Sequence, residues 1–263
     1  MGLFSLFQPF LIGGMLACTV LGNAHADEIR VLSAGAIEPG LRAAAAAFDR
    51  QTGHVTTLTF NTAPALRRRM GVGLAVGSLV PEAAFDVVIA PPAVLGELAD
   101  AGKLAEGPAH VGRVGMGVTV RDGAPVPDIS SPAALQLAVL SADSLVFNRA
   151  STGLYSEELL KNMDMYDRVE GKTTRYPDGA AVLEHVIAGK GREIGFAAMT
   201  EILLYRGKGL SLVGPLPAAV QNYTAYRAAP LVSSPRAALA QQFVVFLAGP
   251  VAKPLLVAAG VTD

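Results

Sequence analysis

Residues 85–90, Phe-Asp-Val-Val-Ile-Ala, form a nearly continuous apolar run that is closed by two prolines. An apolar run without alternation predicts a strand that is buried on both faces. Upstream, residues 28–33 and 54–60 predict two more strands, and an alanine-rich helix over residues 41–48 lies between them. Strands that alternate with helices in this way predict a parallel sheet with crossover helices, which is the α/β class.

The same alternation continues through the second half of the chain. Strands are predicted over residues 114–120, 144–148, 173–176, 193–196 and 210–213. Helices are predicted over residues 132–140, 151–163 and 178–188, and a final helix is predicted to start at Ser233. The second half therefore predicts a further α/β series.

The first 26 residues contain no Asp, Glu, Lys or Arg. Within them, an apolar run over residues 11–21 leads to Ala24-His25-Ala26, which has the small residues that signal peptidase requires, and the first charge follows at Asp27. We therefore expect a cleavable signal peptide over residues 1–26 and a periplasmic mature protein. Two alternatives stay open: a membrane anchor, although the run is shorter than the ~20 residues of a span, and a lipoprotein modified at Cys18.

Composition narrows the chemistry of the mature chain. The only cysteine lies in the predicted signal peptide, so the mature protein has no disulfide, thiol nucleophile or Cys metal site. His54, His110 and His185 lack metal-ligand spacing, so we expect neither a metal nor a cofactor. With 21 basic and 22 acidic residues, the chain lacks the basic excess that nucleic-acid binding needs. We expect a monomer that binds a small molecule.

Five segments, in their order and spacing, carry a resemblance to a known family. They are residues 29–36 (IRVLSAGA), 60–63 (FNTA), 85–90 (FDVVIA), 151–155 (STGLY) and 193–196 (EIGF). Together they resemble periplasmic solute-binding proteins of the molybdate-binding type, which deliver ligands to ABC transporters. The resemblance implies the type 2 periplasmic binding fold, with two Rossmann-like lobes, a two-strand hinge and the ligand between the lobes. On that pattern lobe one is residues 27–113 plus 230–263, lobe two is residues 118–222, and the hinge strands lie near residues 114–118 and 223–228.

The chain departs from this family where the resemblance places hydroxyl donors to a tetrahedral oxyanion. The departures are Ala36, Ala63, which follows Thr62, and Phe196. Each missing donor would leave an anion oxygen underpaired in a closed cleft, at a cost of about 1–3 kcal/mol. We therefore expect the ligand to be a small organic carboxylate rather than molybdate.

Arginines and helix N-termini are the expected replacements for these hydroxyls. Arg149 follows a predicted strand, Arg67 lies one turn inside the helix that Pro64 opens, and Arg175 lies on another predicted strand. Guanidinium groups pair with carboxylates in a bidentate way, and helix N-termini add N–H donors. The predicted ligand-binding residues are Gly35, Ala36, Thr62, Ala63, Arg67, Arg149, Thr152, Gly153, Tyr155, Gly179 and Phe196.

Less specific roles stay open for several of these residues. The arginines at positions 67–69 fit a solvated helix face, and Tyr155 fits core packing. The threonines fit helix N-caps, and the glycines fit turns. These alternatives depend on where each side chain points.

The rival interpretation is an enzyme on the same fold. Some relatives in the wider group resemble a periplasmic aconitate isomerase, which moves a double bond and a proton without a cofactor. Such an isomerase needs cationic or N–H contacts for three carboxylates and one group that takes a proton from carbon. Tyr155, Asp178 and Glu38 are the candidates for that group. A ligand-sensing subunit of a membrane receptor is a third alternative.

Overall fold

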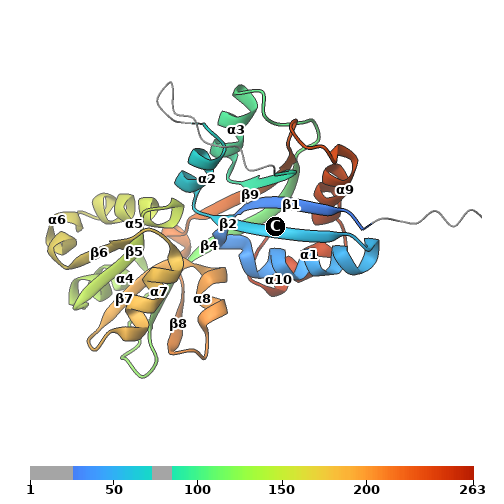
Figure 1. Ribbon diagram of the computed structural model, residues 1–263. Coiled ribbons are helices and arrows are strands. Elements are labelled where there is room, and N and C mark those ends of the chain that lie inside the picture. Colours follow the sequence, from blue (N-terminus) through green and yellow to red (C-terminus); the bar gives the residue numbers. More distant parts are fainter. Residues whose placement is uncertain (1–25, 73–84) are drawn as a thin grey trace, which may run out of the picture.

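The computed structural model describes residues 26–72 and 85–263 (Figure 1). The predicted signal peptide, apart from Ala26, lies outside the described residues, and so does Cys18. Nineteen helices and strands of more than three residues follow in the described part, and they alternate as the α/β class requires. The predicted fold class is therefore confirmed.

The first strand group is parallel, in the order β2-β1-β3. Its strands are β1 (Glu28–Ala34), β2 (Val55–Asn61) and β3 (Val87–Ala90). The short helix η1 (Gly35–Ile37) and the helices α1 (Glu38–Thr52), α2 (Ala63–Arg69) and α3 (Pro92–Asp100) follow these strands. All four residues of β3 are buried, as the apolar run predicts.

The second strand group is also parallel, in the order β7-β5-β6. Its strands are β5 (Ser144–Asn148), β6 (Thr173–Tyr176) and β7 (Glu193–Ala198). The accompanying helices are α4 (Pro132–Ser141), α5 (Ser151–Asn162), α6 (Tyr166–Val169), α7 (Gly179–Ala188) and α8 (Met199–Tyr205), with the short helices η2 (Glu170–Lys172) and η3 (Ala218–Val220).

Two long antiparallel strands join the groups, β4 (Ala109–Arg121) and β9 (Tyr223–Pro230). The first half of β4 pairs with β9, and β9 also pairs with β3. The second half of β4 pairs with β7 and with β8 (Leu210–Pro215). Eight of the nine described strands thus form one hydrogen-bonded path, in which β4 pairs with strands of both groups, and β8 lies off this path and pairs with β4. The predicted hinge segments lie within β4 and β9, while the proposed lobe boundaries stay a prediction.

Each strand group has its own apolar packing. The larger core lies between the first group and the C-terminal helices α9 (Ala237–Leu247) and α10 (Ala252–Ala258), where the rings of Phe48 and Phe243 meet with centroids 5.0 Å apart. A second core on the other group contains Phe147 and Phe196. Figure 1 shows these two bodies on either side of β4 and β9. The two strand groups therefore belong to two separately packed bodies that β4 and β9 join.

Two helix boundaries show where sequence signals predict a helix end correctly and where they do not. α1 ends at Thr52 and is capped by Gly53, whose φ of 77° is the left-handed conformation that a glycine adopts without strain. The predicted start of the final helix at Ser233 is wrong, because α9 begins at Ala237. Ser234 Oγ donates to the buried Asp86 (2.6 Å) and accepts from the Arg236 N–H (3.0 Å), which holds this segment in a turn.

Within the described ranges, no single helix is both long and apolar enough to cross a bilayer; α9 and α10 meet that test only together, as a pair bent by 56°.

Candidate functional site

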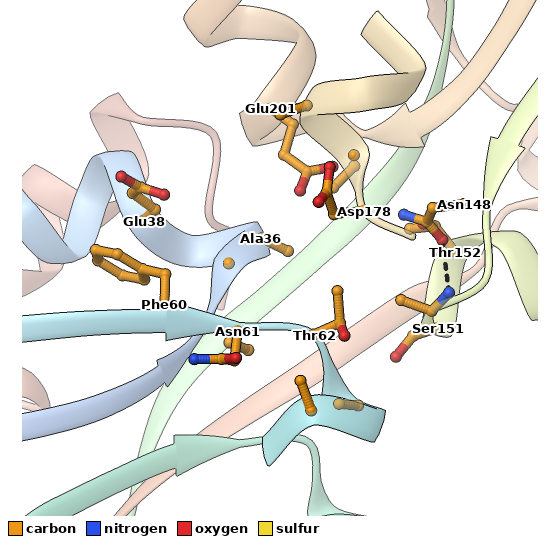
Figure 2. Close-up of a pocket in the computed structure, with 18 of the residues that line it drawn as sticks. Ala36, Glu38, Phe60, Asn61, Thr62, Asn148, Ser151, Thr152, Asp178 and Glu201 are labelled. Carbon is orange, nitrogen blue, oxygen red and sulfur yellow. Dashed lines mark hydrogen bonds between the residues drawn. The ribbon is translucent and has the colours of Figure 1, made fainter. Parts of the chain in front are cut away.

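A pocket of about 540 Å³ opens where the two parallel strand groups face each other. Most of its lining comes from the segments at or directly after the ends of β1, β2 and β3 on one side and of β5, β6 and β7 on the other. Ligands of open α/β sheets bind outside the carboxyl ends of the strands. Figure 2 shows the side chains that project into this space from both sides. The topology thus brings together residues that are far apart in the sequence.

Part of the predicted ligand set lines this pocket. These residues are Gly35, Ala36, Thr62, Ala63, Thr152 and Gly179. Each lies within the first few residues after a strand, and this placement follows from the parallel topology because all such ends meet at one edge.

The arginines on which the sequence analysis relied do not line the pocket. Arg149 is exposed, and its backbone N–H donates to the carbonyl oxygen of Tyr176 (2.8 Å). The Nε atom of Arg67 lies 2.8 Å from a carboxylate oxygen of Glu97, a pairing that raises the pKa of Arg67. Arg68, the next residue along α2, is the one Lys or Arg among the described lining residues.

Arg175 is also held elsewhere in the structure. Its guanidinium group pairs with Glu157 (3.2 Å) and Glu170 (2.7 Å) and lies over the ring of Phe147. These contacts raise the pKa of Arg175, with the Glu170 hydrogen bond as the main cause. This arginine therefore ties α5 and η2 to the edge strand β6 and has no place in the pocket lining.

Tyr155 and Phe196 belong to the second core. The Tyr155 hydroxyl donates to the carbonyl oxygen of Val220 (2.9 Å), and burial raises the pKa of this tyrosine. Phe196 is 2 % exposed and packs within the core. Neither residue lines the pocket, so a missing hydroxyl at Phe196 carries no weight for the ligand.

Asn148, at the end of β5, occupies the N-terminus of α5. Its Oδ1 atom accepts hydrogen bonds from the N–H groups of Ala150 (2.9 Å) and Gly153 (3.0 Å) and from the Thr152 hydroxyl (3.1 Å). Three donors converging on one oxygen fix the amide orientation, so Nδ2 is the atom left to donate. Gly153 is required here because a Cβ atom would lie 1.5 Å from the carbonyl oxygen of Asn148.

Several helices begin at the pocket wall. α2 has no side-chain cap at Thr62, whereas Asn148 accepts from two N–H groups at the start of α5 and Asp178 caps α7 by accepting from the N–H of Ala181 (3.0 Å). The first turn of a helix has N–H groups without intrahelical partners and a partial positive charge. The backbone around this pocket therefore favours an anion.

Three acidic side chains also line the pocket: Glu38, Asp178 and Glu201. Glu38 pairs with Arg42 (2.7 Å). Figure 2 shows Asp178 and Glu201 projecting from the same side of the pocket, across from Thr62. In the described part of the chain, no group of three or more His, Cys, Asp or Glu side chains is placed to hold a metal ion.

Glu201 has a raised pKa. Burial of its carboxyl group raises its pKa to about 7, the Asp178 and Glu38 charges add to the rise, and a hydrogen bond from the backbone of Ala198 opposes it. The residue is partly accessible at the pocket, but its Oε2 atom is buried and has no hydrogen-bond partner. A carboxyl group with a pKa near neutrality can hold or release a proton under working conditions.

Sequence reasoning missed Glu201 and two tyrosines of the lining, Tyr205 and Tyr226. Burial raises the pKa of both tyrosines, and Tyr226 is 3 % exposed. Glu201 had one sequence signal, because it stands three residues after Ala198, where a helix can begin with a glutamate that reaches back to the cap. That signal was too weak to reveal α8.

Comparisons with known proteins agree with this fold. The family model described as bacterial extracellular solute-binding protein matches residues 29–262. An aconitate isomerase from Pseudomonas sp. is 25% identical over 250 residues, which cover 94% of this chain and 92% of that protein.

Solved structures of binding proteins share the architecture. The periplasmic molybdate-binding protein of Azotobacter vinelandii is similar with a TM-score of 0.70 at 18% identity, covering 89% of this chain and 99% of that one. The structure of PEB3 with bound L-phospholactate is similar with a TM-score of 0.67 at 10% identity, with the same shares covered. These likenesses confirm the type 2 periplasmic binding fold.

Proposed function

Because the chain belongs to the family of bacterial extracellular solute-binding proteins, we propose that it captures a small organic carboxylate outside the cytoplasm and delivers it to an ABC transporter. The observation that carries this proposal is the meeting of helix N-termini at a pocket of about 540 Å³. Helix N-termini supply N–H donors for an anion. The volume lies within the range of sites for organic ligands and exceeds the needs of one tetrahedral oxyanion.

The pocket wall supports an organic rather than a metal oxyanion. Ala36 and Ala63 stand where the molybdate-binding pattern has hydroxyl donors, and both line the pocket. The hydroxyl of Thr152 is engaged by Asn148. Fewer hydroxyls and more methyl groups suit a ligand with a carbon skeleton, while Arg68 supplies one cation at the pocket edge.

A thermal-shift series tests this proposal. Purified protein is heated with molybdate, tungstate and sulfate, and separately with di- and tricarboxylates. A ligand at ~100 Kd stabilises the folded state by about 2.7 kcal/mol. We expect a carboxylate to give this stabilisation. A rise in Tm with the oxyanions and none with any carboxylate would contradict the proposal.

A second candidate is a cofactor-free isomerase of a tricarboxylate. Two observations favour it: the similarity to an aconitate isomerase over 94% of the chain, and the carboxyl group of Glu201 in the pocket. The reaction removes a proton from one carbon of the substrate and returns a proton to another, so one acid–base group serves both steps. Of the candidates from the sequence, Glu38 and Asp178 line the pocket with Glu201, whereas Tyr155 does not.

Incubation of the protein with cis-aconitate in D₂O separates the two candidates. An isomerase produces trans-aconitate, which carries deuterium on carbon to the extent that the proton held by Glu201 exchanges with solvent between the two steps, and Glu201→Gln abolishes the formation of trans-aconitate. A binding protein returns the unchanged isomer without carbon-bound deuterium. NMR of the recovered ligand measures both outcomes, and a Glu184→Gln variant on the exposed face of α7 is the matched control.

A further inference from the structure

We propose that Glu201 binds the ligand as a neutral carboxylic acid, so that capture of a carboxylate takes up one proton. This inference rests on the proposed function and deepens it, because it names a ligand-binding residue and the form in which that residue acts.

The geometry begins with the space around the carboxyl group. Glu201 reaches the pocket from the first turn of α8 and lies against Gly179, the first residue of α7. A Cβ atom at Gly179 would lie 2.2 Å from Glu201 Oε2, so the missing side chain makes room for this carboxyl group. The same Oε2 atom is buried without a hydrogen-bond partner. An ionised carboxylate with one buried oxygen unpaired is costly, and the hydrogen bond that this group receives from the backbone of Ala198 offsets only part of the cost of burial, so the carboxyl group favours its protonated form.

The charged side chains around Glu201 oppose its ionised form, and they outweigh, together with burial, the hydrogen bond from the backbone of Ala198. Among the described residues, the charges that act on Glu201 belong to Asp178, which caps α7, and Glu38, at the start of α1, and both are acids. Tyr205 on α8 and Tyr226 on β9 are the other titratable groups coupled to Glu201, and their raised pKa values keep them neutral at pH 7. Glu201 therefore has no cationic neighbour to stabilise its ionised form.

An anionic ligand increases the preference of Glu201 for its neutral, protonated form. A carboxylate in the pocket adds another negative charge, which raises the pKa of Glu201 further, and it also supplies an acceptor for the Glu201 O–H. The carboxylic acid donates one hydrogen bond to the ligand oxygen, and the proton stays on Glu201. Above pH 7 the free protein must first take up that proton, so Kd rises with pH, by at most tenfold per unit. Below pH 6 Glu201 is already neutral and adds no pH dependence.

Calorimetry with tricarballylate tests the inference, because this saturated tricarboxylate has no double bond to isomerise. Titrations at pH 8 in HEPES and in Tris, whose ionisation enthalpies differ, give the number of protons taken up with each ligand. For the unmodified protein we expect between one half and one proton, and roughly a tenfold weaker Kd at pH 8.5 than at pH 7. Glu201→Gln keeps an N–H donor but cannot titrate. It should bind tricarballylate without proton uptake, whereas the exposed Glu184→Gln control should keep the uptake.

The outcomes separate this inference from the proposed function. Binding without proton uptake, or uptake that persists in Glu201→Gln, overturns the role of Glu201 and leaves carboxylate capture intact. If neither tricarballylate nor any other di- or tricarboxylate binds between pH 5.5 and 8.5, the proposed function fails as well. The unmodified protein alone decides whether a proton is taken up, so a variant that does not fold cannot rescue the inference.

Discussion

Replacing Glu201 by Gln should stabilise the ligand-free protein at alkaline pH. The carboxyl group has an ordinary pKa of 4.5, which burial in the folded protein raises to about 7. The folded state therefore binds this proton more tightly than the unfolded state does. The resulting stability is fully present below pH 4.5 and is lost as the pH rises to about 7. Gln cannot titrate and escapes this loss.

The size of the effect follows from the same shift in pKa. Each unit is worth about 1.4 kcal/mol, so a rise from 4.5 to about 7 corresponds to about 3 kcal/mol over the full range. Between pH 5 and pH 8 the free energy of unfolding of Glu201→Gln should gain about 2 to 3 kcal/mol relative to the unmodified protein. The exposed Glu184→Gln variant makes the same chemical change on the adjacent helix and should show almost no pH-dependent difference.

Urea unfolding at pH 5, 6, 7 and 8, followed by circular dichroism, measures this difference for all three proteins. A difference between Glu201→Gln and the unmodified protein that is equal at every pH would refute the reasoning. It would mean that the carboxyl group has the same pKa in the folded and unfolded states. An equal pH-dependent gain in Glu184→Gln would show that net charge, rather than burial, is the cause.

Three further predictions concern the pocket, the core and the N-terminus. Arg68→Ala should weaken tricarballylate binding by about twofold to fivefold in calorimetry, because the Arg68 charge is exposed at the pocket edge. Arg69→Ala on the same helix should leave Kd unchanged. Equal effects of the two changes would contradict the placement of Arg68 at the pocket. Gly153→Ala should lower the free energy of unfolding by about 3 kcal/mol, because the new Cβ would meet a main-chain oxygen at 1.5 Å. Gly171→Ala, with open space around its Cβ, should change the free energy of unfolding by less than about 1 kcal/mol. Similar Tm values for the two variants would refute this difference. Intact mass of the exported protein should correspond to a chain that begins at Asp27, and a lipidated or uncut form would exclude that cleavage.

The backbone of the site was predictable because strand ends follow simple rules. The apolar run before Pro91 and the β-branched run before Asn61 locate two strand ends, and a parallel sheet brings such ends to one edge. Gly35, Thr62 and Gly179 line the pocket for this reason. No comparable rule places Ala36 or Ala63 as ligand contacts, and their binding roles stay predictions.

The charged side chains were not predictable in the same way. The direction of Arg67 is set by Glu97, thirty residues further along the chain, and the direction of Arg175 by Glu157 and Glu170. Long side chains select partners that only the tertiary structure brings near. Glu201 was missed because α8 has seven residues and no strong start signal, and its perturbed pKa depends on burial by other elements.

The side chain of Asn148 accepts hydrogen bonds at the start of α5 that a bound anion could otherwise accept. A carrier works in a cycle and must stay folded in both halves of it, loaded and unloaded. At α5 the amide oxygen of Asn148 satisfies two backbone N–H groups and one hydroxyl whether or not an anion is nearby. Release of a ligand therefore leaves no new unsatisfied donors at this helix. The stability of α5 then does not depend on whether the pocket is occupied. Affinity can then be tuned at the other helix ends without loosening the start of α5.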